Sequence, residues 1–360
     1  MSQTNKDALL DTLKGVVEPS LGRDVVSLGL VRNVSTCDGV AQVIYELPRH
    51  VATDAIQKSL RQQTEARLST QSGVQKVNVE IRVTADQGAA GLPGVKRVVA
   101  VGAGKGGVGK STVATLLAVG LKRRGLAVGL LDADVYGPSL PKITGTENAQ
   151  PMGDEQGRII PPQRDGIPIM SMGYLVDPDQ AIIWRGPMAQ KYVKEFIDRG
   201  FWGELDYLIV DLPPGTGDIP LTLAQSIPLT GAVVVCTPQD VALLDAVKAL
   251  RMYQKLNVEP LGIVENMSYH LCPQCGHRED IFGHGGCEKA AAQLGVPFLG
   301  EIPLNVAIRR NGDAGDMFAN FTNVDREVHD AIDGFVNRVH EEINGREQSR
   351  KPLPQLRISG

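Results

Sequence analysis

The sequence is short of the features that mark membrane proteins and nucleic-acid-binding proteins. Among its 360 residues no uninterrupted apolar stretch is long enough to span a bilayer. The N-terminal segment Met1–Asp7 carries no hydrophobic core of a secretory signal. Aromatic residues make up only 4%, too few for a platform that stacks single-stranded bases. The net charge of -4 argues against a general nucleic-acid binder, so we expect neither membrane nor nucleic acid as a partner.

Cysteine is also scarce. Five cysteines in a chain of this length do not form a disulfide framework. We therefore expect a reducing compartment, the cytoplasm, in which a close cysteine pair indicates metal or redox chemistry. The hydrophobic content of 42% and the charged content of 22% are ordinary for a soluble globular protein that buries a full core.

A glycine-rich loop with the pattern G-x-x-x-x-G-K-S/T organises the chain. It lies between a β-branched apolar run, Lys96–Val101, and a helical pattern that begins at Val113, which is the strand-to-helix context that this pattern requires. Backbone N–H groups of such a loop surround phosphate groups, Lys110 reaches the terminal phosphates, and the Ser111 hydroxyl ligates Mg²⁺. We expect ATP to bind at the residues of the loop: Gly104, Lys105, Gly106, Gly107, Val108, Gly109, Lys110, Ser111 and Thr112.

Acidic residues follow two further strand patterns. Asp132 and Asp134 come directly after the apolar run Leu126–Leu131, and Asp211 ends a later apolar run. We expect Asp134 to orient the attacking water, Asp132 to lie near the metal or its water shell, and Asp211 to hold the Mg²⁺ water shell. The N–H of Gly215, in the next turn, is expected near the γ-phosphate. An aspartate after a strand is also common turn chemistry, and that alternative stays open for Asp134.

The alternation of strand and helix patterns predicts an α/β fold. From 96 to 345 buried strands alternate with helices, which favours a P-loop NTPase domain with a doubly wound, mainly parallel sheet and an active crevice at its carboxyl edge. Residues 1–84 predict a small α+β domain in the order helix, strand, strand, helix, strand. The stretch 85–95 predicts a flexible linker, and 346–360 a flexible tail. A Pro- and Gly-rich stretch at 150–168 predicts a β-hairpin.

A Cys-x-x-Cys pattern, formed by Cys272 and Cys275, follows the strand pattern Leu261–Met267. Two thiolates at this spacing suit one soft metal centre or one disulfide, whereas a closed zinc or cluster site needs about four ligands. Three interpretations compete. Two chains each donate the pair to one iron–sulfur cluster, one chain completes a zinc site with Cys287 or a nearby histidine, or the pair is redox-active. The spacing does not separate the first two, and on its own it favours zinc.

The phosphate loop resembles the deviant Walker A box of the MinD, ParA and nitrogenase-iron-protein class, because Lys105 adds a second lysine at its start. Without this resemblance Lys105 would be interpreted as a solvated surface lysine. The resemblance implies a catalytic role in which Lys105 crosses a dimer interface to the partner's phosphates. It also implies that Asn266 reads the adenine base through its amide. We expect Pro303 and Leu304, which follow the last strand pattern, to form walls of that pocket.

Residues 96–305 resemble the Mrp/ApbC (Nbp-type) iron–sulfur carrier ATPases. The matching segments are the phosphate loop, Asp132–Ser139, Asp211–Asp218, Asn266–Ser268, the Cys-Pro-Gln-Cys-Gly segment and Ile281–Gly283. The resemblance implies a homodimer that holds a labile [4Fe-4S] cluster between the Cys272 and Cys275 pairs of two chains. It implies ATP and Mg²⁺ as cofactors, slow hydrolysis, and transfer of the cluster to apo iron–sulfur proteins, with assembly scaffold proteins as further partners. Cys287 is not a ligand in that family pattern.

The segment Val17–Val31 resembles the start of the MIP18-type domain of iron–sulfur assembly proteins. Many members carry a cysteine after the second strand, where this chain has Glu46–His50, so we expect no metal ligand there. Two rival functions stay open: a MinD/ParA-like positioning ATPase on membrane or DNA, and a zinc-stabilised NTPase switch. The first requires an amphipathic membrane helix or a basic surface, and the amphipathic segment Val324–Ile343 leans acidic.

Overall fold

The computed structural model describes residues 9–19, 23–26, 30–37, 39–48, 54–71, 74–84, 92–175 and 186–349. They fall into two compact units, a small one that ends at residue 87 and a large one over 88–350. Most of the predicted linker, 85–91, and most of the predicted tail, 350–360, lie outside the described residues.

The small unit is a three-stranded sheet with a helix across it. Residues 9–13 are helical, and the regular elements that follow are β1 (Val17–Glu18), β2 (Arg23–Asp24), β3 (Val31–Cys37), β4 (Val40–Pro48), α2 (Asp54–Leu68) and β5 (Lys76–Thr84). β4 pairs antiparallel with β3 and parallel with β5, since α2 provides the crossover that a parallel pair needs. Leu60 of α2 is buried with Val43 and Tyr45 of β4, which makes one hydrophobic layer.

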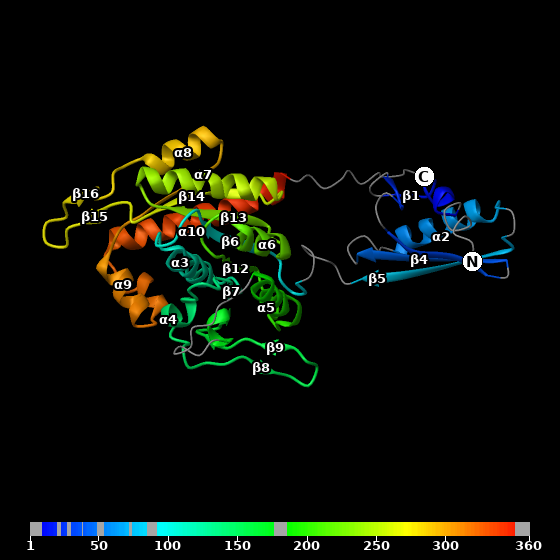
Figure 1. The fold of residues 1–360 in the computed structure, drawn as a ribbon, viewed down its shortest axis with the longest axis horizontal. Helices are drawn as coiled ribbons and strands as arrows, with labels where there is room; N and C mark the ends of the chain where they lie inside the picture. The colour runs from blue at the N-terminus through cyan, green and yellow to red at the C-terminus, as the bar shows by residue number, and fades with distance from the viewer. Residues whose placement is uncertain are drawn as a thin grey trace. The chain divides into compact units, whose positions relative to one another are not determined.

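The large unit contains an eight-stranded sheet in the order β10-β11-β7-β12-β6-β13-β14-β17 (Figure 1). Its strands are β6 (Val98–Ala103), β7 (Val128–Asp132), β10 (Gln163–Arg164), β11 (Ile167–Ser171), β12 (Tyr207–Asp211), β13 (Gly231–Cys236), β14 (Pro260–Asn266) and β17 (Phe298–Ile302). All pairs are parallel except β10 with β11. The inner strands are continuous apolar runs because both faces of a parallel sheet are covered.

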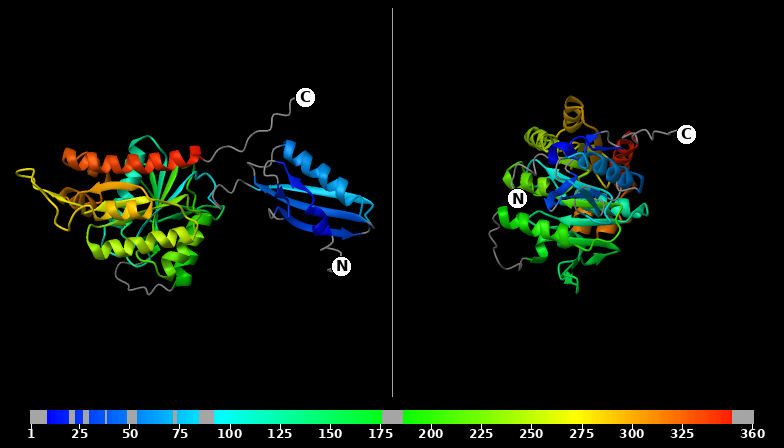
Figure 2. Two further views of the ribbon diagram at one scale, coloured as in Figure 1. Left: turned by 90° about the horizontal axis from the view of Figure 1, so that it is seen from above. Right: turned by 90° about the vertical axis from the view of Figure 1, so that its right-hand side faces the viewer.

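Helices cover both faces of this sheet, which confirms the doubly wound prediction. The helices are α3 (Lys110–Arg123), α4 (Leu140–Thr144), α5 (Gly186–Arg199), α6 (Asp218–Ser226), α7 (Asp240–Lys255), α8 (Gly286–Leu294), α9 (Val306–Asp313) and α10 (Arg326–Ser349). Figure 2 shows α10 on one face of the sheet and α7 on the other. The first face buries Leu117 of α3 with Phe335 of α10, and the second buries Phe196 of α5 with Ala246 of α7.

One stretch differs from the sequence-based expectation. The predicted hairpin at 150–168 contains the antiparallel pair β8 (Met152–Gly153) and β9 (Ile159–Ile160), but the chain then forms β11, a fully buried strand beside β7. Pro168 and the preceding glycine hide this strand, since both residues weaken a strand pattern. At the domain borders, Leu92 and Val95 are buried in the large unit's core, and α10 continues to Ser349.

The apolar face of α10 is packed into the protein core. Val328, Ile332, Phe335, Val336 and Val339 are fully buried, so the amphipathic pattern seen in the sequence serves the interior of the large unit. No helix among the described residues has the length and apolar content of a membrane span.

Candidate functional site

The phosphate loop connects β6 to α3, and its glycines are required by close contacts. Gly107 and Gly109 have positive φ angles of 81° and 79°, a conformation that side chains disfavour. A Cβ atom on Gly109 would lie 2.3 Å from Nδ2 of Asn266, and one on Gly104 would lie 2.1 Å from the backbone carbon of Asp245. The loop therefore packs against both α7 and the end of β14.

A cavity of about 690 Å³ opens at the carboxyl edge of the sheet, beside this loop. Its volume lies in the range of small-molecule sites. The predicted site residues that line it are Lys105, Gly106, Gly107, Gly109, Lys110, Ser111, Thr112, Asp134 and Asn266, together with the predicted walls Pro303 and Leu304. Gly104, Val108, Asp211 and Gly215 lie outside this lining.

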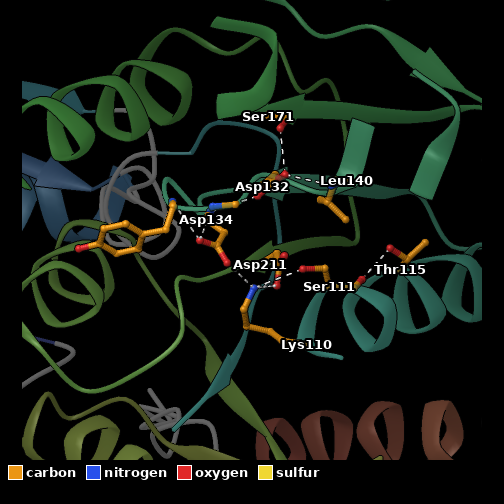
Figure 3. A network of polar contacts seen from close by, with 10 residues as sticks. Lys110, Ser111, Thr115, Asp132, Asp134, Leu140, Ser171 and Asp211 are labelled. Carbon is orange, nitrogen blue, oxygen red and sulfur yellow. Dashed lines mark hydrogen bonds and ion pairs between the residues drawn. The ribbon is translucent and has the colours of Figure 1, made fainter. Parts of the chain in front are cut away.

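Lys110 lies at the centre of a buried polar network (Figure 3). Its Nζ atom is 2.6 Å from Oδ1 of Asp211 and 3.2 Å from Oδ2 of Asp134. Burial lowers the pKa of Lys110, but the carboxylates of Asp211 and Asp134 outweigh burial, so the pKa is raised above its ordinary value. Burial has the opposite effect on a carboxylate: it raises the pKa of Asp211 above its ordinary value, although the charge of Lys110 acts to lower it. The ammonium thus occupies the position between two carboxylates that both favour its charge.

The donor set at this point fits Mg²⁺. Oδ2 of Asp211 is buried and has no hydrogen-bond partner among the described residues, which is unusual for a carboxylate oxygen. The Ser111 hydroxyl lies 3.4 Å from Nζ of Lys110, which also contacts Asp211. Carboxylate and hydroxyl oxygens, with water, are the ligands that Mg²⁺ prefers. Ser111 and Asp211 are therefore the residues that would hold the ion or its water shell.

Asp132 lies close to this network but does not line the cavity, and its place near a metal or its water shell stays a prediction. It is fully buried, and its oxygens accept hydrogen bonds from the backbone N–H groups of Asp134 and Leu140 and from the Ser171 hydroxyl, at 3.1, 3.1 and 2.9 Å. Burial and the charge of Asp211 raise its pKa to about 7. Because both oxygens hold the chain around Asp134, Asp132 positions that loop and does not line the cavity.

Ser171 is a functional candidate that the sequence did not reveal. It ends β11, the strand hidden by the Pro- and Gly-rich stretch, and parallel pairing places it beside Asp132 of β7. Its hydroxyl donates to Asp132 and accepts from the N–H of Gly173. No sequence pattern signals this role, because it arises from the order of strands in the sheet.

Two other predicted residues use their polar groups within the chain. The N–H of Gly215 donates to the carbonyl of Ala103 at 2.8 Å and not into the cavity, while the neighbouring Pro214 lines the cavity. The side-chain amide of Asn266 donates to the carbonyl of Val108 at 2.8 Å. Asn266 therefore supports the phosphate loop, and base reading by this amide stays a prediction.

Lys105 lines the cavity and is half-buried. Within the described part of the chain it forms no hydrogen bond or ion pair, in contrast to Lys110. The structure therefore leaves its ammonium available to a ligand or to another subunit, and its action on a partner's phosphates stays a prediction.

The cysteine pair lies in a turn between two short antiparallel strands, β15 (His270–Leu271) and β16 (Arg278–Glu279). This hairpin extends away from the sheet (Figure 1). The N–H of Cys272 donates to the carbonyl of His277, and the N–H of Gly276 donates to the carbonyl of Cys272. Cys275 is exposed and Cys272 half-buried. The N–H groups of Gln274 and Cys275 lower the pKa of the Cys272 thiol, which favours the metal-binding thiolate.

Cys287 is not part of this pair. It begins α8 in the core, where its N–H donates to Glu265 and its thiol points to the carbonyl of Thr237 beside Cys236. The hydrogen bond with Cys236 and burial raise the pKa of the Cys287 thiol above its ordinary value. In the described ranges no three His, Cys, Asp or Glu side chains are grouped to hold a metal, so a one-chain zinc site with Cys287 or a nearby histidine is not assembled there.

Comparison with known proteins finds a matching family model for each of the two units. Residues 94–340 match the family model described as NUBPL iron-transfer P-loop NTPase, and residues 6–81 match that of an iron-sulfur cluster assembly protein. The iron-sulfur cluster carrier protein of Synechocystis is 45% identical over 319 residues, covering 86% of this chain and 90% of that protein. The protein of the same description from Escherichia coli is 41% identical over 332 residues, covering 89% of each chain.

Two solved structures resemble the large unit. A nucleotide-binding protein from Archaeoglobus fulgidus in complex with ADP is 40% identical, with a TM-score of 0.57, over 62% of this chain and 88% of that chain. The cell division ATPase MinD of Pyrococcus furiosus, at 21% identity and a TM-score of 0.52 over 68% of this chain and 98% of that one, shows the shared fold alone. With the phosphate loop, the buried lysine and the matched length of sequence, this chain belongs to the NUBPL iron-transfer P-loop NTPase family.

Proposed function

We propose that the protein binds ATP and carries a [4Fe-4S] cluster as cargo, which it hands to apo iron–sulfur proteins. One observation carries this proposal: a phosphate-binding cavity and a cysteine pair with too few ligands for a closed site occur in the same unit. Only the stretch from Asn266 to Cys272 separates them along the chain. The names of the relatives from Synechocystis and Escherichia coli support the same cargo.

ATP hydrolysis would use the residues of the buried network. The loop N–H groups would bind the phosphates, and Lys110 would exchange its carboxylate contacts for the terminal phosphates. That exchange would free Asp134 to accept a hydrogen bond from the attacking water, whose oxygen bonds to the γ-phosphorus as the bond to the ADP oxygen breaks. Mg²⁺, held through Ser111 and Asp211, would neutralise charge on the phosphates. Asp132 would keep the loop of Asp134 in place.

The cluster would need a second copy of the chain. Each chain offers two thiolates, Cys272 and Cys275, whereas a [4Fe-4S] cluster takes about four. We therefore propose a homodimer in which the paired hairpins face each other and Lys105 acts on the partner's nucleotide. Two ligands from each chain on an exposed hairpin make release of the cargo easier than a closed site in one chain would. We place this dimer in the cytoplasm, where apo-proteins and assembly scaffolds would be its partners.

We propose the same domain limits as the sequence suggested, with 1–84 as an accessory domain, 85–95 as linker, 96–345 as the ATPase and 346–360 as tail. The buried Leu92 and Val95 favour a start of the ATPase domain slightly before 96. The rival MinD-like function has only the fold in its favour, and the zinc-switch rival lacks a group of three ligands within the described residues.

Anaerobic reconstitution with ferrous iron and sulfide tests the cargo. We expect about four irons per dimer, with the absorbance of a cluster, and loss of both in Cys272→Ser and Cys275→Ser variants. Cys287→Ala is the matched control: it removes a thiol of the same unit that lies in the core, so iron loading should persist. Tightly bound zinc with no cluster under these conditions, or a monomer with metal loaded and nucleotide present, would contradict the proposal.

A further inference from the structure

One arginine fastens the base of the cysteine hairpin to the body of the unit. Arg278 lies in β16, and its guanidinium carbon is 3.9 Å from the centroid of the Tyr269 ring. Its nitrogens contact three different side chains, at 2.9, 3.2 and 3.1 Å respectively: Asp280, Glu301 and His284. The ring of His284 in turn lies 3.5 Å from Glu301. The guanidinium is therefore fixed in its plane by three partners and on its face by a fourth.

The same contacts continue to the nucleotide cavity. Glu301 lies in β17, which ends beside the cavity-lining Leu304. The N–H of Leu304 donates to the carbonyl of Tyr269 at 2.8 Å. Asn266 lies three residues before Tyr269, and its side-chain amide donates to the carbonyl of Val108 in the phosphate loop. An unbroken series of contacts thus joins the phosphate loop, the cavity wall and the hairpin base.

A strained residue lies within this series. Met267 lines the cavity and has a φ of 55°, in the left-handed region that non-glycine residues rarely adopt. Such strain persists where the surrounding structure enforces it, and it concentrates at functional sites. Here it lies between the residue that supports the phosphate loop and the segment that leads into the hairpin.

We propose that Arg278 is a positioning residue that couples nucleotide binding to the orientation of the cysteine hairpin. A phosphate group entering the loop displaces the contacts of Val108 and Asn266, and the rigid series from Met267 to Tyr269 transmits that displacement to the guanidinium. The inference rests on the proposed function, because it assigns the control of cargo release at the Cys272 and Cys275 pair.

Single exposed ion pairs contribute little to stability, and the side chain of Arg278 is 38% exposed. Its importance here is geometric. The planar guanidinium group hydrogen-bonds several acceptors in fixed directions and stacks on an aromatic ring. A lysine ammonium does not reproduce this arrangement. Arg278→Lys should therefore resemble Arg278→Ala in coupling, although it keeps the charge.

Amide hydrogen exchange of the full-length protein tests this coupling without any cluster. We expect a non-hydrolysable ATP analogue with Mg²⁺ to change the exchange rates of the hairpin amides, residues 270–279, by about fivefold or more, the lower end of typical allosteric couplings. In Arg278→Ala and Arg278→Lys the change should fall below about twofold, while nucleotide affinity stays at the wild-type value. Arg326→Ala, which removes another exposed arginine that pairs with Asp330, is the matched control and should behave as wild type.

Two results would overturn the inference: hairpin exchange that does not respond to the nucleotide in the wild-type protein, or a full response in Arg278→Ala. Neither depends on iron. A protein that shows nucleotide-dependent hairpin exchange lost on Arg278 substitution, yet never loads a cluster, would support the coupling and contradict the cargo. In reconstituted protein we also expect the effect of ATP on the rate of iron release to a chelator to disappear with Arg278→Ala.

Discussion

Removal of the Ser171 hydroxyl perturbs the buried anchor beneath the proposed catalytic loop. Ser171→Ala deletes one of three donors to the Asp132 carboxylate. A hydrogen bond to a charged group contributes about 1.5–3 kcal/mol, and the N–H of Gly173 also loses its acceptor. We expect the large unit to lose about 2–3 kcal/mol of unfolding free energy near pH 8. That loss corresponds to a melting temperature lower by about 4–12 °C.

The size of this loss should depend on pH. The pKa of Asp132 is raised from 3.8 to about 7, first by burial and then by the charge of Asp211, and the Ser171 hydroxyl opposes both. A group whose pKa is higher in the folded than in the unfolded state lowers the free energy of unfolding as the pH rises toward the folded-state pKa. Without the hydroxyl the pKa of Asp132 rises further, so Ser171→Ala should lose extra stability above about pH 7 and little of it at pH 6.

Thermal unfolding of the full-length protein at pH 6 and pH 8 measures the effect, with Thr144→Val as the control. The buried Thr144 hydroxyl donates to the neutral carbonyl of Leu140 at 2.7 Å and also bonds the neutral Thr146 hydroxyl at 2.8 Å. Its removal should therefore cost the same at both pH values. A Ser171→Ala deficit that does not grow between pH 6 and pH 8 would refute the idea that Ser171 holds a charged Asp132.

Substitutions of Lys110 and Gly109 test the phosphate loop. Lys110→Met removes the cation between buried carboxylates, so ATP affinity, measured by calorimetry, should fall at least about tenfold. The free energy of unfolding should fall as the pH rises, because the pKa of Asp211 increases further without the lysine. Unchanged ATP affinity would exclude Lys110 from phosphate binding. Gly109→Ala and Gly125→Ala both place a side chain at φ near 80°, but only Gly109 has a near atom, Nδ2 of Asn266 at 2.3 Å. Gly109→Ala should therefore lower the melting temperature clearly more than Gly125→Ala. Equal losses would show that the Asn266 side chain moves aside at no measurable cost.

The fold was predictable where sequence and burial give the same signal. The run Gly231–Cys236 coincides with β13, in which every residue is buried, because a strand covered on both faces is a continuous apolar run. β11 was missed for the converse reason. It is equally buried, but Pro168 falls inside it and its antiparallel neighbour β10 is only two residues long, so local composition indicated a hairpin.

The site was predictable where its residues are contiguous in sequence. The loop from Gly104 to Thr112 carries its own strand-to-helix context, and the structure brings most of it to one cavity. Roles that depend on strand order were not accessible. Asp132 and Asp134 look equivalent in sequence, yet one lines the cavity and the other is fully buried, because β11 contributes the hydroxyl that holds it. Local patterns specify which groups are present, and the sheet order determines which of them meet.

The cysteines show the same limit in a form that bears on function. By spacing alone Cys287 was a candidate third ligand, and a third ligand in the same chain would favour tight zinc. In the structure Cys287 is buried in the core, where its N–H donates to Glu265. Cys272 and Cys275 lie on a hairpin outside the core. A pair that is accessible, short of ligands and held by contacts that run to the nucleotide cavity is suited to cargo that must leave. A closed site in the core would retain its metal and would give the nucleotide nothing to control.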